Sequence, residues 1–458
     1  MTAYRFPPGF VWGAATSAFQ IEGGAEADGR GESIWDRFAA TPGRIADGAD
    51  ARVACDHYHR WPEDIALMRA LGLGAYRFSI AWPRVLPRGR GPVNPAGLDF
   101  YDRLVDGLLA AAITPFVTLD HWDLPQALED EGGWASRATV DAFVDYADHV
   151  SARLGDRVRH WTTHNEPWCI AHLGHEQGDH APGRRDPARA LRAAHHLLLS
   201  HGRAVPVLRA NARAAEVGIV LILSPAEPAT ASPADIDAAR WFDGFFNRWY
   251  LDPLFRGAYP ADAVADRALR GHLPPGELPF VQPGDLATIA TPIDFLGVNY
   301  YSPAILRGDP PAAPGGPPRP VQIVPDAPRT DMGWEVRPAG LHDLLVRVAA
   351  DYHPPTIYVT ENGAAYDDPP DASGRIDDVR RIDFLRGHLL ALGRALDAGV
   401  PVAGYFHWSL LDNFEWGHGY GKRFGLVHVD FASQRRTCRA SATFYRDVVA
   451  TRAVDPSP

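Results

Sequence analysis

Short apolar segments alternate with amphipathic helical segments along the chain, and this alternation limits the possible folds more than any other feature. The segments that we predict as strands cover residues 10–20, 75–80, 114–119, 160–166, 216–223, 295–301, 357–361 and 402–410. Helical spacing of apolar residues occurs between them, at residues 56–71, 95–112, 139–154, 187–211, 236–250, 338–351 and 377–398. A buried strand followed by a crossover helix, repeated in this way, predicts a parallel sheet whose outer face is covered by helices.

The number of repeats indicates how that sheet is arranged. Eight strands are the number that closes a parallel sheet into an α/β barrel, the (β/α)8 or TIM-barrel fold, with its active site at the carboxyl ends of the strands. An open doubly wound sheet would need a glycine-rich phosphate turn after the first strand, and Gly-Ala-Ala-Thr at residues 13–16 is not such a fingerprint. Residues 303–329 are rich in proline and glycine, but they directly follow the sixth strand. We therefore predict a single catalytic domain over residues 1–458, with extended loops on the carboxyl-terminal face.

Composition and charge argue against several classes of partner. The net charge is −11 and the basic residues are spread along the chain, which argues against nucleic acid. No charged and apolar leader opens the chain, and no apolar run has the length of a membrane span. The three cysteines are too few for a disulfide framework. We expect a cytoplasmic protein without a membrane partner, and the oligomeric state stays open.

Two of the predicted strands end on a glutamate. Residues 357–363 read IYVTENG, so Glu361 follows an apolar run and precedes an Asn-Gly pair. We expect that pair to turn the backbone through positive φ angles and to leave the carboxylate facing the site. Residues 160–167 read HWTTHNEP, where Pro167 stops the strand after Glu166. Two strand-end carboxylates on one barrel predict a two-carboxylate active site.

The other strand ends carry side chains that suit a neutral polyol. Carboxylates and amides form hydrogen bonds with hydroxyl groups, while indole faces cover the C–H surface of a sugar ring. The sequence has neither a phosphate-binding loop nor a cluster of basic residues that would suit a phosphate. The predicted rim consists of Gln20, Glu22, Arg77, His121, Trp122, Asn165, Asn299, Tyr301, Trp408, Glu415 and Trp416.

Two carboxylates beside a sugar predict glycoside hydrolysis. We assign Glu361 as the nucleophile, because Arg77 would favour its ionised form and Tyr301 can form a hydrogen bond with it. Glu166 is then the general acid, with a pKa raised by the neighbouring anion, and it becomes the base once Glu361 is esterified. Asn165 is expected to contact the sugar 2-hydroxyl. In a retaining enzyme the two carboxyl groups lie about 5–5.5 Å apart.

Several motifs resemble those of the β-glucosidases of glycoside hydrolase family 1, over nearly the whole chain. Residues 163–167 (THNEP) are similar to the acid/base motif of that family, and residues 359–363 (VTENG) to its nucleophile motif. Residues 10–23, 295–301 and 408–416 resemble its amino-terminal, sixth-strand and sugar-clamping segments. The resemblance implies hydrolysis of small β-D-glucosides and short β-linked oligosaccharides, with retention of configuration and without a cofactor.

The resemblance also implies roles for individual residues. On the glycone side it implies sugar-binding positions for Gln20, His121, Trp122, Asn299, Trp408, Glu415, Trp416 and Phe424. Glu415 would bind the 4- and 6-hydroxyls, Trp408 the ring and Trp416 the 3-hydroxyl. On the aglycone side it implies Trp168, His180 and Trp334. The chain departs from the family at Asp120, where an aromatic residue is usual, and at His164, where Leu or Phe is common.

Other functions fit much of the same sequence. A β-galactosidase, a β-fucosidase and a transglycosylase would use the same site, and a catalytically silent sugar-binding barrel would share the fold. Glu415 would repel a phosphate, which argues against a 6-phosphoglycosidase. His172, His175 and His180 share a loop with acidic residues, but we predict packing there and no metal site. Cys169 has no base arranged beside it in the sequence, and we expect it to be buried and inert.

Overall fold

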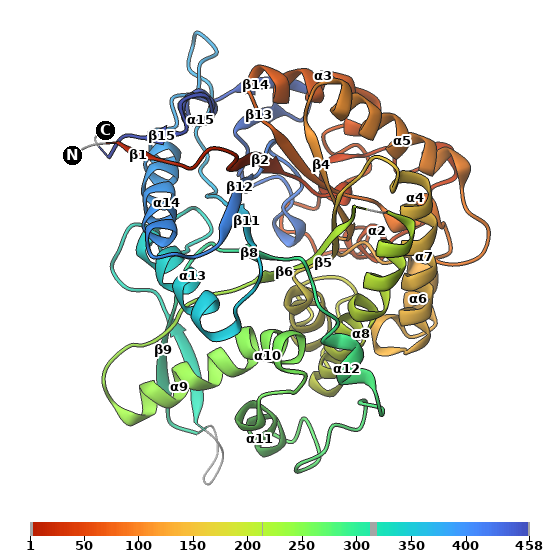
Figure 1. Ribbon diagram of the computed structural model, residues 1–458, viewed down its shortest axis with the longest axis vertical. Coiled ribbons are helices and arrows are strands. Elements are labelled where there is room, and N and C mark those ends of the chain that lie inside the picture. Colours follow the sequence, from red (N-terminus) through yellow and green to blue (C-terminus); the bar gives the residue numbers. More distant parts are fainter. Residues whose placement is uncertain (1–2, 213, 312–317, 457–458) are drawn as a thin grey trace.

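The computed structural model describes residues 3–212, 214–311 and 318–456, and a closed barrel of parallel strands lies at its centre (Figure 1). The strands follow one another around the ring in the order β11-β12-β2-β3-β4-β5-β6-β8, and β8 pairs with β11 to close it. They are β2 (Val11–Ala15), β3 (Ala75–Ser79), β4 (Thr114–Asp120), β5 (His160–Asn165), β6 (Glu216–Ile222), β8 (Phe295–Asn299), β11 (Ile357–Asn362) and β12 (Val402–Trp408). The predicted (β/α)8 fold is confirmed.

Helices surround the barrel, and each buries an apolar face. In α5, for example, Phe100, Leu104 and Leu108 recur every four residues and are buried. Figure 1 shows α3, α5 and α7 on one side of the barrel and α13 and α14 on the other. The long helices are α3 (His57–Ala70), α5 (Pro95–Ala110), α7 (Ala138–Leu154), α8 (Pro187–Asn211), α9 (Pro233–Asp243), α10 (Trp249–Arg256), α11 (Ala261–Leu269), α13 (Pro338–Tyr352), α14 (Val379–Asp397) and α15 (Ala440–Thr451). Among the described residues, no helix has both the length and the apolar composition needed to cross a bilayer.

Shorter elements complete the fold. The short helices are α1 (Ala18–Ile21), α2 (Ile34–Ala39), α4 (Trp82–Val85), α6 (Gln126–Asp130) and α12 (Asp285–Ile289), with 3-10 turns at Ala27–Gly29, Gly133–Ala135 and Trp416–His418. Near the two ends of the chain, β1 (Tyr4–Arg5) pairs with β15 (Ala453–Val454). A three-stranded sheet contains β7 (Ala226–Pro228), β9 (Ala304–Asp309) and β10 (Arg319–Ile323). A two-stranded sheet contains β13 (Val427–Asp430) and β14 (Arg435–Cys438).

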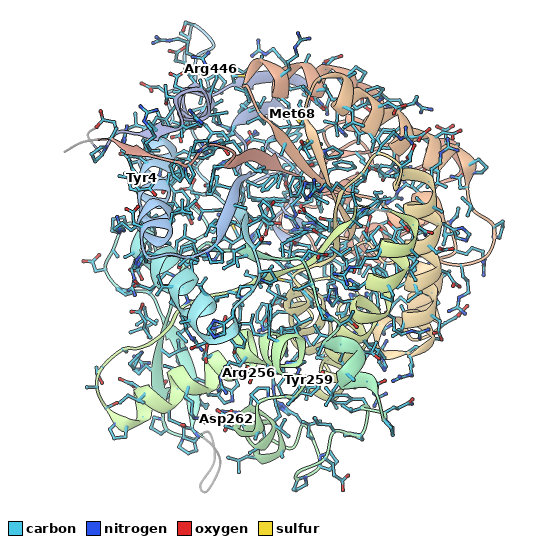
Figure 2. The ribbon with its side chains drawn as sticks, in the orientation of Figure 1. Tyr4, Met68, Arg256, Tyr259, Asp262 and Arg446 are labelled. Carbon is cyan, nitrogen blue, oxygen red and sulfur yellow. The ribbon has the colours of Figure 1, made fainter. Side chains whose placement is uncertain are left out.

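Aromatic side chains fill the interior of the barrel. The ring of Phe116 on β4 lies 5.3 Å from that of Tyr358 on β11 and 4.8 Å from that of Phe406 on β12. A Cβ atom at Gly13 would lie 2.5 Å from Phe406, so the neighbouring strand must carry glycine there. Side chains also fill the space between strands and helices, where Met68 of α3 is completely buried (Figure 2). The barrel is therefore a packed core, and functional residues must lie at its rim.

Two predicted elements differ from the observed ones. The first strand was predicted over residues 10–20, but it ends at Ala15, and Gln20 lies on the short helix α1. The predicted helix over residues 236–250 is divided into α9, a π-helical turn at Gly244–Arg248 and α10. A second π-helix, Cys169–Gln177, follows β5. Hydrophobic periodicity could not predict these turns, because a π-turn shifts the spacing by one residue over a single turn.

Candidate active site

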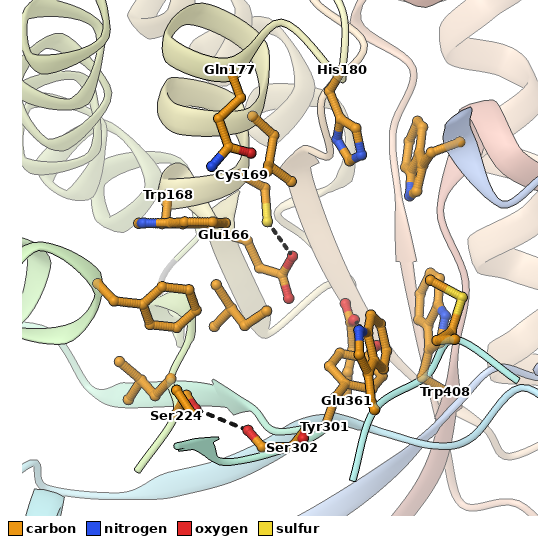
Figure 3. A pocket seen from close by; sticks show the side chains of 18 of the residues that line it. Glu166, Trp168, Cys169, Gln177, His180, Ser224, Tyr301, Ser302, Glu361 and Trp408 are labelled. Atoms are coloured by element: carbon orange, nitrogen blue, oxygen red, sulfur yellow. Dashed lines mark hydrogen bonds between the residues drawn. The ribbon is translucent and has the colours of Figure 1, made fainter. Parts of the chain in front are cut away.

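The two predicted catalytic glutamates face one cavity at the carboxyl ends of the barrel strands. Glu361 is the penultimate residue of β11, and Glu166 immediately follows β5. Each is only 3% exposed. Both line a cavity of about 480 Å³, in which Trp408 lies beside Glu361 and Trp168 lies close to Glu166 (Figure 3). The backbone of Glu166 has a φ of 49°, an unfavourable angle for a residue with a side chain.

The Asn-Gly pair after Glu361 works differently from our prediction. The structure gives neither Asn362 nor Gly363 a positive φ. Asn362 instead donates from Nδ2 to the carbonyl of Tyr300 at 2.8 Å. A Cβ atom at Gly363 would lie 1.7 Å from the carbonyl oxygen of Trp408, so the glycine permits close passage of two strand ends. The left-handed conformation belongs to Glu166, which the sequence did not indicate.

Two strong donors hold the carboxylate of Glu361. Arg77 donates from one guanidinium nitrogen to Oε1 at 2.6 Å, and the Tyr301 hydroxyl donates to Oε2 at 2.6 Å. Burial raises the pKa of Glu361, whereas the Arg77 charge and the Tyr301 hydrogen bond act in the opposite direction. The predicted partners are therefore in place. The net direction is nevertheless upward, because the carboxyl is removed from water.

Glu166 has weaker donors and a higher affinity for a proton. Asn299 donates from Nδ2 to Oε1 at 2.7 Å, and the Cys169 thiol donates to Oε2 at 3.2 Å. Burial, and secondly the charge of Glu361, raise the pKa of Glu166 to about 8. We had attributed the raised pKa to the neighbouring anion alone, but burial is the larger cause. Because the Arg77 cation binds Glu361 directly, the proton that the pair retains at neutral pH belongs on Glu166.

Asn165 connects the residues around the two glutamates. Its Oδ1 accepts hydrogen bonds from Arg77 at 2.6 Å and from Asn299 at 3.1 Å, and its Nδ2 donates to Nε2 of His121 at 3.1 Å. The indole of Trp122 donates to its carbonyl at 2.9 Å. These contacts place residues from four strands and their following loops in one rigid network beneath the cavity.

A third buried carboxyl, Glu415, lines the cavity and is paired with Gln20. The Gln20 amide donates to Oε2 of Glu415 at 3.4 Å and to the carbonyl of Phe414 at 2.9 Å. Ser17 donates to the other end of that amide at 2.6 Å, which fixes its orientation. Burial, followed by the charges of Glu361 and Glu166, raises the pKa of Glu415 to about 8.

Aromatic rings form the remaining walls of the cavity. The ring of Trp416 lies 4.5 Å from that of Trp122, and the ring of His121 is stacked 5.8 Å from that of Trp408. Trp334 lies 5.2 Å from Tyr301. The predicted residues that line the cavity are His121, Trp122, Glu166, Trp168, His180, Tyr301, Trp334, Glu361, Trp408, Glu415, Trp416 and Phe424.

Some predicted site residues lie behind the cavity wall. Four of them, Arg77, Asn165, Asn299 and Gln20, are at most 1% exposed and are not among the residues that line the cavity, although Arg77 and Gln20 form hydrogen bonds with lining glutamates. Their expected roles toward a substrate stay predictions. Glu22 does not belong to the site, although we placed it at the rim. It follows α1, whose turn directs its carboxylate toward Arg84 at 3.0 Å and toward the hydroxyl of Tyr101 at 2.6 Å.

Comparisons with known proteins agree with this geometry. The family model described as glycosyl hydrolase family 1 matches residues 2–454. The chain belongs to this family. β-Glucosidase A of Thermotoga maritima is 47% identical over 99% of this chain and 100% of the relative. Thermostable β-glucosidase B of Thermobispora bispora is 50% identical over 97% of this chain and 90% of the relative. A bifunctional β-D-glucosidase/β-D-fucosidase of Bifidobacterium breve is 45% identical over 97% and 98%.

Solved structures of family 1 enzymes have the same fold. The family 1 β-glucosidase from Thermotoga maritima aligns with a TM-score of 0.94, covering 99% of this chain and 100% of that chain. The same enzyme has been solved in complex with deoxynojirimycin, also with a TM-score of 0.94. The resemblance seen in the motifs is thus confirmed, and the chain is an O-glycosyl hydrolase of a retaining family.

Sequence reasoning missed several residues of the family 1 site. Cys169 was expected to be buried and inert, and it is buried with a raised pKa, but its hydrogen bond to Glu166 was not predicted. Its position three residues after Glu166, at the start of a helix, was the available signal. The cavity is also lined by Ile222, Phe242, Phe245 and Phe246, which we had not predicted there. The aromatic members of this group lie within residues 236–250, which we had predicted only as a helix.

The histidine-rich loop of this family 1 enzyme is packed. His172 forms a 2.6 Å contact with Glu176, which also binds Arg267 at 2.9 Å. The ring of His180 packs 5.2 Å from Trp35 and 5.4 Å from Trp122. Within the described part of the chain, no three His, Cys, Asp or Glu side chains converge as a metal site would require.

Proposed function

We propose that the chain is a retaining β-glucosidase in which Glu361 is the nucleophile and Glu166 the acid/base residue. The observation that carries the proposal is the unequal environment of the two carboxyls. Arg77 and Tyr301 bind one of them, while the other is buried with a pKa of about 8. A protonated acid and an anion at one cavity are what double displacement requires.

In the first step a carboxylate oxygen of Glu361 attacks the anomeric carbon. The bond from that carbon to the glycosidic oxygen breaks, and the proton of Glu166 passes to the leaving oxygen. The product is an α-linked glucosyl ester of Glu361. The hydroxyl of Tyr301 and the guanidinium of Arg77 are in position to stabilise the carboxylate before attack and as it is released.

In the second step water replaces the aglycone. Esterification removes the negative charge of Glu361, so one of the two causes that raise the pKa of Glu166 disappears. Glu166, now ionised, takes a proton from water as the water oxygen bonds to the anomeric carbon and the ester bond breaks. Two inversions give a product with retained β configuration.

A mechanism-based label tests the role of Glu361. Incubation with an activated 2-deoxy-2-fluoro-β-D-glucoside should trap the glucosyl ester, and peptide mapping should find the label on Glu361. A label on any other residue contradicts the assignment. Absence of both label and turnover would instead support a catalytically silent sugar-binding barrel. Product analysis with added acceptor sugars measures the share of transglycosylation.

The sugar preference and setting are further parts of the proposal. Glu415 beside Gln20 suits hydroxyls at positions 4 and 6, which supports glucose; the β-D-fucosidase activity named for the Bifidobacterium breve relative makes fucosides the second candidate. Rates on matched aryl glucosides, galactosides and fucosides decide between them. Short β-linked glucans, as in cellulose breakdown, are supported as substrates by the 1,4-beta-D-glucan glucohydrolase of Thermotoga neapolitana, which is 46% identical over 97% of this chain and 98% of the relative.

We also propose one catalytic domain over residues 1–458 and a reducing, cytoplasmic setting. The cytoplasmic setting is supported by three free cysteines.

A further inference from the structure

The part of the cavity away from Trp408 has an apolar wall. Its charged lining residues are Glu166, Glu361 and Glu415, all of which surround the proposed sugar site. Figure 3 shows Trp168 and Ser224 on the side of Glu166 away from Trp408. This outer wall consists of Trp168, Leu173, Ile222, Leu223, Phe242, Phe245, Phe246, Pro303 and Ala304.

Two π-helices build the outer wall. The first, Cys169–Gln177, presents Leu173 and Gln177 to the cavity, and the second, Gly244–Arg248, presents Phe245 and Phe246. The ring of Phe246 lies 4.5 Å from Trp168 and is stacked 4.8 Å from Phe242. These contacts keep the aromatic wall in one position before any ligand arrives.

Few polar groups are available on this wall. Its polar lining side chains are Gln177, Ser224, Ser302 and Gln322. The Ser224 hydroxyl already donates to the carbonyl of Ser302 at 2.9 Å. Gln177 and Gln322 are exposed, so they lie where the cavity meets solvent. A second sugar bound here would lose water from several hydroxyls and find few partners, whereas an apolar group would gain from burial.

We propose that this half of the cavity takes an apolar aglycone, an aryl or long alkyl group, in preference to a second sugar. The inference rests on the β-glucosidase function proposed above. A series of n-alkyl β-D-glucosides tests it without changing the chemistry of the leaving oxygen. We expect kcat/KM to rise with chain length, with octyl exceeding both ethyl glucoside and cellobiose by at least roughly tenfold.

Two different failures can be told apart in this experiment. A flat chain-length series, or cellobiose turned over as well as octyl glucoside, overturns the apolar-aglycone inference alone. Failure to hydrolyse any β-glucoside would instead contradict the proposed function. All alkyl glucosides are used below their micelle concentrations, so that kcat/KM refers to single molecules.

Variants locate the effect on the wall. Leu173→Gln and, separately, Phe246→Leu should lower the octyl-to-ethyl ratio of kcat/KM several-fold, because each removes apolar contact area. Phe255→Leu is the control, since it makes the same substitution as Phe246→Leu at a half-buried phenylalanine that lies on α10, outside the cavity lining. An equal change of the ratio in the control, or no change in either wall variant, contradicts the location.

A second inference rests on a different observation, the contact between Cys169 and Glu166. The Cys169 sulfur lies 3.2 Å from Oε2, and its backbone N–H donates to the Glu166 carbonyl at 2.9 Å. Asn299 donates to Oε1, so each carboxyl oxygen of Glu166 receives one protein donor. The other groups that influence the charge of Glu166 are Glu361, Arg77, Tyr301 and Glu415.

We infer that Cys169 is a positioning residue that orients Oε2 and stabilises the ionised form of Glu166 through its S–H. A donor to an acceptor oxygen interacts more strongly when that oxygen carries charge. The thiol should therefore favour the base step, in which Glu166 must be ionised, while remaining weak enough to let Glu166 hold its proton in the acid step. A hydroxyl would be a stronger donor than the thiol.

The pH at which kcat/KM falls on the alkaline side, the alkaline limb of the pH profile, distinguishes a donor role of Cys169 from simple packing. Cys169→Val keeps an apolar side chain but removes the donor, so the limb should move to higher pH by roughly half a unit. Cys169→Ser restores a donor, and the limb should return to the wild-type position or below it. The inference is overturned if the alkaline limb shifts equally in Cys169→Val and Cys169→Ser, or if it shifts in neither variant.

Cys55 supplies the matched control. It is also completely buried, and its thiol donates to the carbonyl of Asp412 at 3.0 Å, away from the cavity lining. Cys55→Val should leave the alkaline limb unchanged even if it lowers thermal stability. Hydrolysis of the glucosyl ester provides an independent readout. A dinitrophenyl glucoside has a good leaving group, so its kcat is limited by ester hydrolysis, the step in which Glu166 must be ionised. Cys169→Val should therefore lower kcat more for this substrate than for an alkyl glucoside.

Discussion

Glu166 and Glu361 have the same side chain, but the groups around them differ in charge. Arg77 and Tyr301 supply a cation and a phenol to Glu361, while Asn299 and Cys169 supply only neutral donors to Glu166. Both carboxyls are buried, which favours their neutral forms. The cation determines which of the two keeps the proton at neutral pH. At the residue scale, one guanidinium thus supports the proposed roles of Glu361 as nucleophile and Glu166 as acid.

The raised pKa of Glu166 predicts the pH dependence of activity. The acid step needs protonated Glu166, so kcat/KM should fall as pH rises through about 8. Glu166→Gln should lower kcat/KM on alkyl glucosides by roughly 10²- to 10⁴-fold. A dinitrophenyl glucoside needs no acid for departure of its leaving group, so its kcat/KM should not show this alkaline fall if Glu166 causes it. An alkaline limb of unchanged position in Glu166→Gln would assign that pKa to another group.

The ends of β11 and β12 illustrate constraint at the scale of elements. Residues that follow Glu361 must turn away from the cavity, and they do so by passing directly against the backbone of β12. The Asn362 side chain contributes by donating to Tyr300 and accepting from the Tyr405 hydroxyl at 2.9 Å. The orientation of the nucleophile therefore depends on contacts between adjacent strand ends.

Gly363→Ala should disturb this junction. The added Cβ would lie 1.7 Å from the Trp408 carbonyl oxygen, which forces the strand ends apart. We expect the free energy of unfolding to fall by about 1–3 kcal/mol, measured by urea titration, with loss of activity because Glu361 moves with the strand. Gly74→Ala is the control, since its nearest atom, the Trp12 oxygen, lies at 3.8 Å. Equal stability of the two variants would show that the junction accommodates a methyl group.

At the scale of the whole molecule, a buried ion pair joins the segment after the last barrel strand to the last long helix. Asp412, which follows β12, accepts two hydrogen bonds from Arg439 at 2.9 and 2.8 Å and one from Arg423 at 2.9 Å. Arg439 immediately precedes α15. Burial alone would raise the pKa of Asp412, but these arginines lower it overall. The carboxylate thereby holds the sugar-clamping segment against the outer helix layer.

Asp412→Asn should destabilise the protein and change its acid sensitivity. Removing one partner leaves buried arginine charge, so we expect a loss of about 3–5 kcal/mol in the free energy of unfolding at pH 7. Because the folded-state pKa is depressed, this stabilisation exists above the unfolded pKa of about 3.9 and disappears as pH falls through the folded value. Urea titrations should therefore show the two proteins converging below pH 4. The control is Asp447→Asn, an exposed partner of Arg446, and an equal loss there would contradict the argument.

Much of this architecture was predictable because its signals are local. The alternation of strands and helices, and the positions of Glu166 and Glu361 at strand ends, follow from residue type and spacing. Glu22 shows the limit: it was placed at the rim, yet the turn of α1 directs its carboxylate to Arg84. The place of Phe246 in the cavity wall and the contact of Cys169 with Glu166 were not predicted, because π-helical turns decide where these side chains point.

The sequence by itself determined the barrel, the two carboxylates at strand ends and the family, because each depends on patterns within one segment or on their order along the chain. The sequence also proposed Glu361 as the anion through Arg77, but only the tertiary structure brings these two residues, 284 positions apart in the chain, within 2.6 Å of each other. The tertiary structure also decided the burial that raises the pKa of Glu166 and the apolar wall formed by two separate π-helices. Distances, desolvation and shared donors arise only when distant segments pack together.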